Sequence, residues 1–143
     1  MTCLICTRIE LIKKGENPFF VKELKTGYVV LGDHQFFEGY TLFLSKIHAR
    51  ELHDLNQDFK KKFLLEMSKV AEAVFRAFKP INLNYELLGN SDKHLHWHIF
   101  PRHTEDPQPT KPVWIIPKSI REHSTPSTKK LEELKKVLLK ELK

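Results

Sequence analysis

The chain has 143 residues, of which 41% are hydrophobic and 29% charged, a balance typical of one globular domain. No apolar run approaches the roughly 20 residues that a helix needs to cross a bilayer, which argues against an integral membrane protein. The net charge of +6 favours an anionic ligand without naming one. Much of the excess lies in the lysines of residues 129–143, which fit the wet face of a helix. Nucleic acid is therefore not an expected partner.

The first residues carry both cysteines of the chain. They lack a basic flank followed by an apolar core, so the sequence predicts no secretory signal and a cytoplasmic location. Cys3 and Cys6 form a Cys-x-x-Cys pair. A disulfide is not expected in a reducing compartment, and the redox form of this motif needs a helix start, which residues 8–18 do not indicate. Two interpretations stay open: buried free thiols, or half of a tetrahedral zinc site completed by His48 and His94.

A hairpin and a long helix follow. Residues 19–24 and 28–31 are predicted to pair as strands around a turn that contains Gly27, and residues 39–44 are predicted as a third strand. Asn56 is placed to cap a helix that ends before Pro80. Apolar residues at helical spacing predict the face of this helix that packs in the core: Phe59, Phe63, Leu64, Met67, Val70, Ala71, Val74, Phe75 and Phe78.

Residues 94–100 are the most informative stretch. A fourth strand is predicted at residues 82–88, and a turn at residues 89–93 leads into a run in which three histidines alternate with large apolar residues. Such alternation predicts a strand that turns its histidines to one face and buries the other face. Side chains two residues apart on a strand lie about 6.5 to 7 Å apart, a spacing that suits phosphorus chemistry or a metal.

The last forty residues divide into two parts. Residues 103–126 are predicted as a proline-rich loop. Two interpretations stay open for Trp114 within this loop: it packs over the sheet, which we slightly favour, or it forms a wall of a base pocket. Residues 127–142 have an apolar side at helical spacing and are predicted as a helix that packs on the sheet or on a partner subunit.

The pattern His-apolar-His-apolar-His-apolar-apolar resembles the defining motif of the histidine-triad (HIT) superfamily of nucleotide hydrolases and transferases. The resemblance runs from Cys3 to about Arg102, and residues 87–98 look like a bacterial branch often described as diadenosine polyphosphate hydrolases. The strand and helix pattern predicts an α+β fold: a HIT-like antiparallel sheet of about five strands with one long helix packed on it and a C-terminal helix. Residues 1–143 are expected to form a single domain with a core of about residues 3–102. A homodimer is implied by the resemblance alone.

The resemblance also implies catalytic roles. His96 is the expected nucleophile that takes the nucleotidyl group from the α-phosphate, His98 contacts phosphate oxygens or the leaving atom, and His94 supports them. A neutral imidazole attacks phosphorus without a separate base if a hydrogen bond at its other nitrogen holds one tautomer. The implied activity is hydrolysis or transfer at the α-phosphate, with dinucleoside polyphosphates and adenosine phosphoramidates as candidate substrates and no organic cofactor.

The family's substrate-binding segments have counterparts in this chain. Gly89-Asn90-Ser91 aligns with a glycine-glutamine-serine or threonine segment that holds phosphates, with asparagine in place of glutamine. Tyr40 stands where a histidine is usual. The expected substrate-binding residues are Asn84, Gly89, Asn90, Ser91 and Gln35, with Asn82 as a competitor for the phosphate contact of Asn84 and with Gln35 placed near the ribose.

Some members of the superfamily bind structural zinc through a Cys-x-x-Cys pair, a loop histidine and the first triad histidine. The matching set here is Cys3, Cys6, His48 and His94, which favours zinc over free thiols. Two other classes of function stay open. One is a zinc-dependent hydrolase in which the three triad histidines are the ligands, although residues in line on a flat strand converge poorly on one ion. The other is a catalytically weak nucleotide-binding module, against which the intact triad argues.

Overall fold

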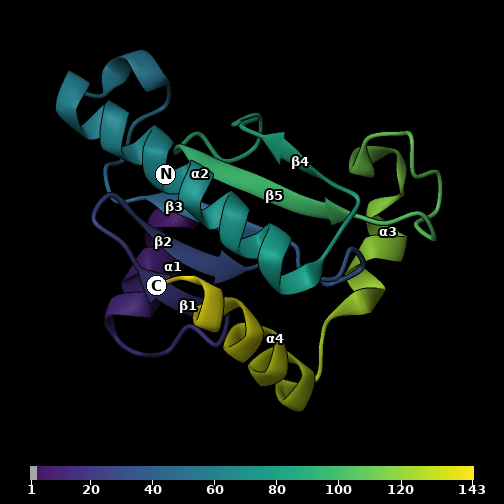
Figure 1. The fold of residues 1–143 in the computed structure, drawn as a ribbon. Helices are drawn as coiled ribbons and strands as arrows, with labels where there is room; N and C mark the ends of the chain where they lie inside the picture. Colours follow the sequence, from purple (N-terminus) through teal and green to yellow (C-terminus); the bar gives the residue numbers. More distant parts are fainter. Residues whose placement is uncertain (1–2) are drawn as a thin grey trace.

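The computed structural model describes residues 3–143 and has a five-stranded antiparallel sheet at its centre (Figure 1). The strand order is β1-β2-β3-β5-β4, so β3 and β5 are neighbours although β4 lies between them in the sequence. The strands are β1 Phe20–Glu23, β2 Gly27–Leu31, β3 Thr41–Ser45, β4 Asn82–Glu86 and β5 His96–Arg102. The predicted α+β fold with its five-stranded sheet is confirmed.

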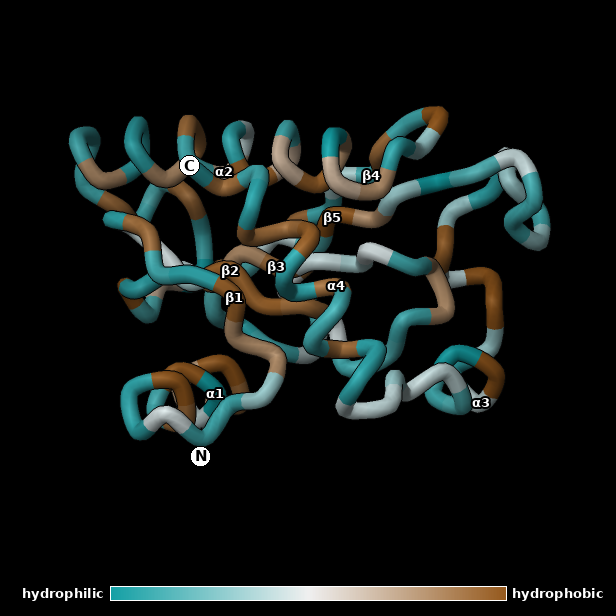
Figure 2. The backbone as a smooth tube through the Cα atoms, turned by 60° about the horizontal axis from the view of Figure 1, so that its bottom comes forward, coloured by the Kyte–Doolittle hydropathy of each residue, from teal (hydrophilic) through white to brown (hydrophobic). Residues whose placement is uncertain are grey.

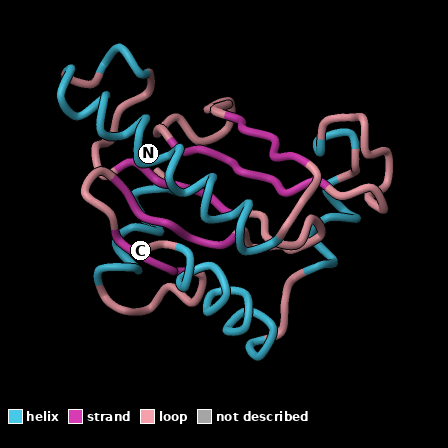
Figure 3. Tube along the Cα trace, viewed as in Figure 1, coloured by secondary structure: helices cyan, strands magenta, loops and turns pink. Residues whose placement is uncertain are grey.

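Four α-helices and three short 3₁₀ helices occur within residues 3–143 (Figure 3). The α-helices are α1 Leu4–Lys13, α2 Gln57–Phe78, α3 Lys118–Arg121 and α4 Thr128–Glu141, and the 3₁₀ helices are η1 Leu52–Asp54, η2 Val113–Ile115 and η3 Glu122–Ser124. The long helix begins as predicted, because the Asn56 side chain accepts a hydrogen bond from the Phe59 amide at 2.9 Å. It ends where Lys79 takes a left-handed conformation before Pro80.

Two segments differ from the sequence prediction. Helix α1 was not predicted; it begins directly after Cys3, whose sulfur accepts a hydrogen bond from the Cys6 amide at 3.4 Å and caps the first turn. The proline-rich segment 103–126 was expected to be a loop but contains η2, α3 and η3. Pro112 and Pro117 each precede a helical turn as its cap, where the missing N–H of proline costs no helical hydrogen bond. Prolines therefore start these turns instead of preventing them.

The sheet separates two hydrophobic cores. Figure 2 shows α2 and α1 on opposite sides of the strands. Helices α2 and α4 cover one face, and α1 with residues 113–116 covers the other. The predicted alternation along β5 is confirmed: Leu95, Trp97 and Ile99 pack with α2, whereas Phe100 belongs to the core on the α1 side. The triad histidines that alternate with them thus lie on the α1 side of the sheet.

Helix α4 packs on its own chain. It contacts α2 and β1, and its Leu131, Leu134 and Leu138 are buried in the same core as α2. Of the two positions predicted for the C-terminal helix, on the sheet or on a partner subunit, the structure shows the helix packed on its own chain beside β1 and α2. Across residues 3–143, the helices include none with the length and hydropathy of a bilayer-spanning segment.

Candidate active site and metal centre

A cleft of about 600 Å³ opens over the α1 side of β5. His96 and His98 line it, with ring centroids 4.9 Å apart and the rings edge to face. His94 precedes β5 and lies instead beside a smaller cavity that it shares with His96 and Gly89. The structure therefore brings two triad histidines into one cleft and places the third behind them.

The tautomer of His96 follows from its hydrogen bond. Its Nδ1 lies 2.6 Å from the backbone carbonyl oxygen of His94, and a carbonyl oxygen only accepts. Nδ1 therefore carries a hydrogen and donates, so that in the neutral ring the lone pair is on Nε2. A ring held in this way presents an unprotonated nitrogen, as a nucleophilic histidine requires.

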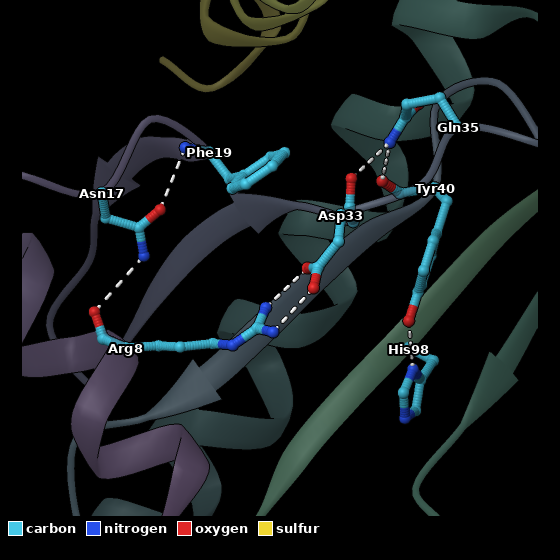
Figure 4. A network of polar contacts seen from close by, with 8 residues as sticks. Arg8, Asn17, Phe19, Asp33, Gln35, Tyr40 and His98 are labelled. Atoms are coloured by element: carbon cyan, nitrogen blue, oxygen red, sulfur yellow. Dashed lines mark hydrogen bonds and ion pairs between the residues drawn. The ribbon is translucent and has the colours of Figure 1, made fainter. Parts of the chain in front are cut away.

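His98 is held by a residue from the loop before β3. The Tyr40 hydroxyl lies 2.7 Å from His98 Nδ1 (Figure 4). Burial lowers the pKa of His98 to about 3, with smaller contributions from His96 and His34, so the ring is neutral at pH 7. Burial also raises the pKa of Tyr40 far above its ordinary value, so the hydroxyl keeps its proton. The sequence marked Tyr40 only as a departure from a family histidine and did not predict this contact.

Charged and aromatic groups surround the mouth of the cleft. Arg8 donates two hydrogen bonds to Asp33, at 2.5 and 2.6 Å (Figure 4). Burial alone would raise the pKa of Asp33, but the bonds and charge of Arg8 outweigh it and hold that pKa below its ordinary value. The guanidinium of Arg121 lies 4.9 Å from the ring centre of Trp114, and both residues line the cleft. These residues come from distant segments, so no local sequence pattern signalled them.

Trp114 packs over the sheet, as the slightly favoured interpretation from the sequence had it, and it also lines the cleft, whereas its contact with a base stays a prediction. Its ring stands edge to face against Phe100 of the sheet, at 5.6 Å, and against His98, at 5.4 Å. It also lines the cleft, and its Nε1 donates to the Glu86 carboxylate on β4. The tryptophan thus packs over the sheet and forms a wall of the cleft at the same time.

The turn between β4 and β5 lies between the cleft and the cysteines. Gly89 has a left-handed conformation, with φ of 65°, and lines the small cavity with His96. Ser91 instead lies in a cavity beside Cys3, and Asn90 is exposed to solvent. Asp92, which the sequence did not single out, is the residue of this turn that reaches the cleft.

Two expected substrate contacts lie elsewhere. Asn84 lines a separate cavity along β4, where its Oδ1 accepts a hydrogen bond from Arg102 Nη1 at 2.7 Å. The Gln35 amide nitrogen donates to the carbonyl oxygens of Gly32 and Tyr40, at 3.1 and 3.0 Å (Figure 4). Gln35 is not among the residues that line the cleft, and its hydrogen bonds shape the loop before β3, while the expected ribose contact stays a prediction. The position of an asparagine or glutamine in the sequence does not show which groups its side-chain amide will bond to.

Cys3, Cys6, His48 and His94 form a second cluster, with one ligand atom from each lying within 4.8 Å of the others. His94 Nε2 lies 2.8 Å from the carbonyl oxygen of Ser45 and must donate to it, so its Nδ1 keeps a lone pair for the cluster. This Nδ1 lies 3.1 Å from His48 Nδ1 and 3.4 Å from the Cys6 sulfur. Tetrahedral zinc with bonds of about 2.0 to 2.3 Å places its ligands about 3.3 to 3.8 Å apart. The donor set therefore fits a closed structural zinc site.

The same hydrogen bonds weigh against a metal held by the triad. His94 directs its free nitrogen to the cysteines, away from His96 and His98. Among residues 3–143, the histidines and cysteines whose ligand atoms gather closely enough for a metal are Cys3, Cys6, His48 and His94, and the group contains neither His96 nor His98. The hydrolase in which these histidines are the zinc ligands has no support in this geometry.

Comparison with known proteins agrees with the fold and the triad. A model of the HIT domain matches residues 14–105, and the chain therefore belongs to the HIT domain family. The chain is 32% identical to "Protein hit" of Bacillus subtilis over 74 residues, which are 48% of this chain and 51% of that protein. It is 28% identical to the adenosine 5'-monophosphoramidase HNT1 of Saccharomyces cerevisiae over 110 residues, which are 72% of this chain and 64% of the yeast protein. The matches thus span about half to two thirds of these relatives.

Solved structures show the same fold. A histidine triad protein of Bradyrhizobium japonicum superposes with a TM-score of 0.77 at 22% identity, covering 87% of this chain and 90% of that one. A HIT protein of Sinorhizobium meliloti gives a TM-score of 0.78 at 18% identity, covering 94% of each chain. At this level of identity the likeness establishes the architecture alone.

Proposed function

We propose that the protein hydrolyses or transfers nucleotide conjugates at the α-phosphate through a covalent nucleotidyl-His96 intermediate. The observation that carries this proposal is the hydrogen bond from His96 Nδ1 to the His94 carbonyl, which leaves an unprotonated Nε2 on a ring that lines the cleft. Membership of the HIT family and the similarity to a yeast enzyme named as a monophosphoramidase support the same chemistry. Dinucleoside polyphosphates and adenosine phosphoramidates are the candidate substrates.

The proposed reaction divides one displacement into two. The lone pair of His96 Nε2 forms a P–N bond to the α-phosphorus while the bond to the leaving group breaks and its electron pair leaves with that group. The imidazolium that forms keeps its Nδ1–H bonded to the His94 carbonyl, which stabilises the new positive charge. Water then attacks the same phosphorus, releases its proton, and frees neutral His96 and the nucleoside monophosphate. We assign the backbone near Gly89, which lines a small cavity with His96, the role of donor to phosphate oxygens.

Turnover kinetics test the proposal. Wild-type protein, His96→Ala and a matched control, His53→Ala, are mixed with diadenosine tetraphosphate or with adenosine phosphoramidate, with and without a chelator. His53 is an exposed histidine whose side chain is 81% accessible, so its removal should leave turnover unchanged. We expect His96→Ala to lose at least about 1,000-fold in kcat, as is usual when a nucleophile is removed. Retention of most of the wild-type turnover by His96→Ala would show that the nucleophile is another group. Nucleotide binding without turnover in the wild type would establish a binding module.

We also propose that the cluster of Cys3, Cys6, His48 and His94 binds one structural zinc ion. When bound, the ion would link the start of α1, the loop after β3 and the start of β5, and so hold the triad strand in place. We expect purified protein to contain about one zinc per chain and His48→Ala to lose it, while His53→Ala keeps it. Metal content equal in the two variants, or none in the wild type, would refute the site.

The quaternary and domain organisation is a further part of the proposal. We propose a homodimer formed across β4, which pairs with β5 on one side and, among residues 3–143, with no strand on the other. Ile81 and Tyr85 are 60% and 53% exposed on and beside this strand, and an open edge of this kind invites pairing. The packing of α4 against α2 supports one domain over the whole chain. A cytoplasmic location stays a prediction from the sequence.

A further inference from the structure

We propose that the Tyr40 hydroxyl holds His98 as a neutral ring that donates a hydrogen bond through Nε2–H. The site consequently favours leaving groups that depart as anions over amines, which must gain a proton in order to depart. This inference rests on the proposed nucleotidyl transfer and names its preferred substrate class: conjugates with a P–O–P link, such as dinucleoside polyphosphates. The residues involved lie on β5 and on the loop between β2 and β3.

The position of Tyr40 is tightly determined. Its ring stacks on Phe100 with centroids 4.0 Å apart, and it is 5% exposed. Its carbonyl oxygen accepts hydrogen bonds from the Gly32 amide, at 2.9 Å, and from the Gln35 side chain, at 3.0 Å. A methyl group on Gly32 would lie 2.1 Å from the Tyr40 ring, so glycine leaves the space that the ring occupies. The hydroxyl is therefore held against His98 by the packing of its own ring.

The direction of the hydrogen bond follows from the number of available acceptors. Within residues 3–143, His98 Nδ1 is the hydrogen-bond partner of the Tyr40 hydroxyl, at 2.7 Å. A buried hydroxyl that accepted from Nδ1–H would leave its own hydrogen without a partner, which is costly. The hydroxyl therefore donates, Nδ1 is unprotonated, and the hydrogen of the neutral ring lies on Nε2. Figure 4 shows this second nitrogen on the side of the ring away from Tyr40.

The neighbouring groups do not change this assignment. His34 lies with its ring centre 5.2 Å from that of Tyr40, and its buried Nδ1 has no hydrogen-bond partner among the described residues. His96 meets His98 edge to face, and Arg121 is occupied by the Trp114 ring and by a backbone carbonyl. The charges of Arg8 and Asp33 are paired with each other.

The consequence for the leaving group is chemical. When a P–O–P bond breaks, the bridging oxygen takes the electron pair and departs as a phosphate anion, which a hydrogen bond from His98 Nε2–H stabilises without proton transfer. When a P–N bond breaks, the nitrogen must receive a proton in order to depart as an amine. If His98 gave up its only proton, it would become an imidazolate, or Tyr40 would have to pass on its proton and become a buried tyrosinate. Burial strongly disfavours both anions, because it removes the water that would stabilise their charge.

The tautomer is tested directly by ¹⁵N NMR of histidine-labelled protein, whatever its activity. We expect His98 in the wild type to show a protonated Nε2 and an unprotonated Nδ1 from pH 6 to 9. Tyr40→Phe should admit the other tautomer. Tyr28→Phe is the matched control, because Tyr28 is a buried tyrosine whose ring packs against Phe20 instead of the triad. A protonated Nδ1 in the wild type, or an unchanged tautomer in Tyr40→Phe, overturns the assignment.

The leaving-group preference is tested by kcat/KM for diadenosine tetraphosphate against adenosine phosphoramidate. We expect the wild type and Tyr28→Phe to favour the tetraphosphate by about 100-fold or more, the usual contribution of a missing general acid. Tyr40→His supplies a side chain that can return a proton to His98, so it should raise phosphoramidate turnover and reduce the ratio by about tenfold or more. Phosphoramidate turnover equal to that of the tetraphosphate in the wild type overturns the preference, even if Tyr40→His does not fold.

The two proposals fail in different ways. Rapid formation of nucleotidyl-His96 from the phosphoramidate would overturn the leaving-group preference and leave the proposed function intact. Absence of the adduct and of turnover with both substrates would overturn the proposed function, and the preference with it. A ratio that stays the same in Tyr40→His, when that variant is folded and active, would show that residue 40 does not set the leaving group.

Discussion

Gly32 gives the sharpest test of how the site is packed. Gly32 is not among the residues with positive φ, so alanine can adopt its backbone conformation without strain. The substitution Gly32→Ala therefore tests packing alone. The added methyl group would lie 2.1, 2.4 and 2.8 Å from three carbon atoms of the Tyr40 ring. These separations are far below contact distance, so the ring must shift from the position in which it stacks on Phe100 and bonds to His98. Overpacking of a buried site costs about 1 to 3 kcal/mol.

For a domain of this size, each kcal/mol lowers Tm by about 3 to 4 °C, so we expect a fall of about 3 to 12 °C. Thermal and urea unfolding measure it, and a double-mutant cycle identifies the cause. In a Tyr40→Ala background the ring is absent, and Gly32→Ala should then cost less than about 0.5 kcal/mol. An equal cost of Gly32→Ala in both backgrounds, or a wild-type Tm for the single variant, would refute the packing argument.

Three further predictions concern acid stability, a buried ion pair and the dimer. Because burial lowers the folded-state pKa of His98 from 6.5 to about 3, the unfolded chain binds the extra proton between these values, and stability is lost as the pH falls below 6.5. His98→Gln should remove up to about 1.4 kcal/mol per pH unit of this loss, as urea unfolding at pH 6 and 5 would show; parallel curves for the two proteins would count against it. Arg102 is buried and donates to Asp106 at 3.0 Å, so Asp106→Ala leaves a buried charge without its partner. We expect this variant to lose about 3 kcal/mol or more in the free energy of unfolding and to be cleaved more readily within residues 103–112. Unchanged stability would contradict this role of the pair. Tyr85→Lys on the β4 edge should convert a dimer to monomer in light scattering, and a wild-type monomer would exclude the proposed pairing.

Local patterns accounted for much of the fold. The alternation at residues 94–100 predicted which side chains of β5 face the helix, and Asn56 predicted the start of α2, because both are set by short-range geometry. Helix α1 was missed because its cap is Cys3, a residue without a strong capping preference, and because only Ile5 and Ile9 along it are buried.

The site was only partly predictable. The triad and the Cys-x-x-Cys pair carry recognisable spacings, and the structure brings Cys3 and Cys6 together with His48 and His94 as candidate metal ligands. The partner of His98 was not predictable, since the Tyr40 contact joins residues 58 positions apart and depends on which way a buried hydroxyl points. The orientation of the Gln35 side chain was not predictable for a related reason, because its amide bonds to the backbone of its own loop.

The central claim is that His96 carries the nucleotidyl group during turnover. The most direct measurement is a rapid quench of wild-type protein with α-labelled diadenosine tetraphosphate, followed by intact mass and by peptide mapping of the label. We expect a mass increase of one nucleotidyl group, located on His96 and absent from His96→Ala. Product formation without any adduct, or an adduct located on another residue, would contradict it.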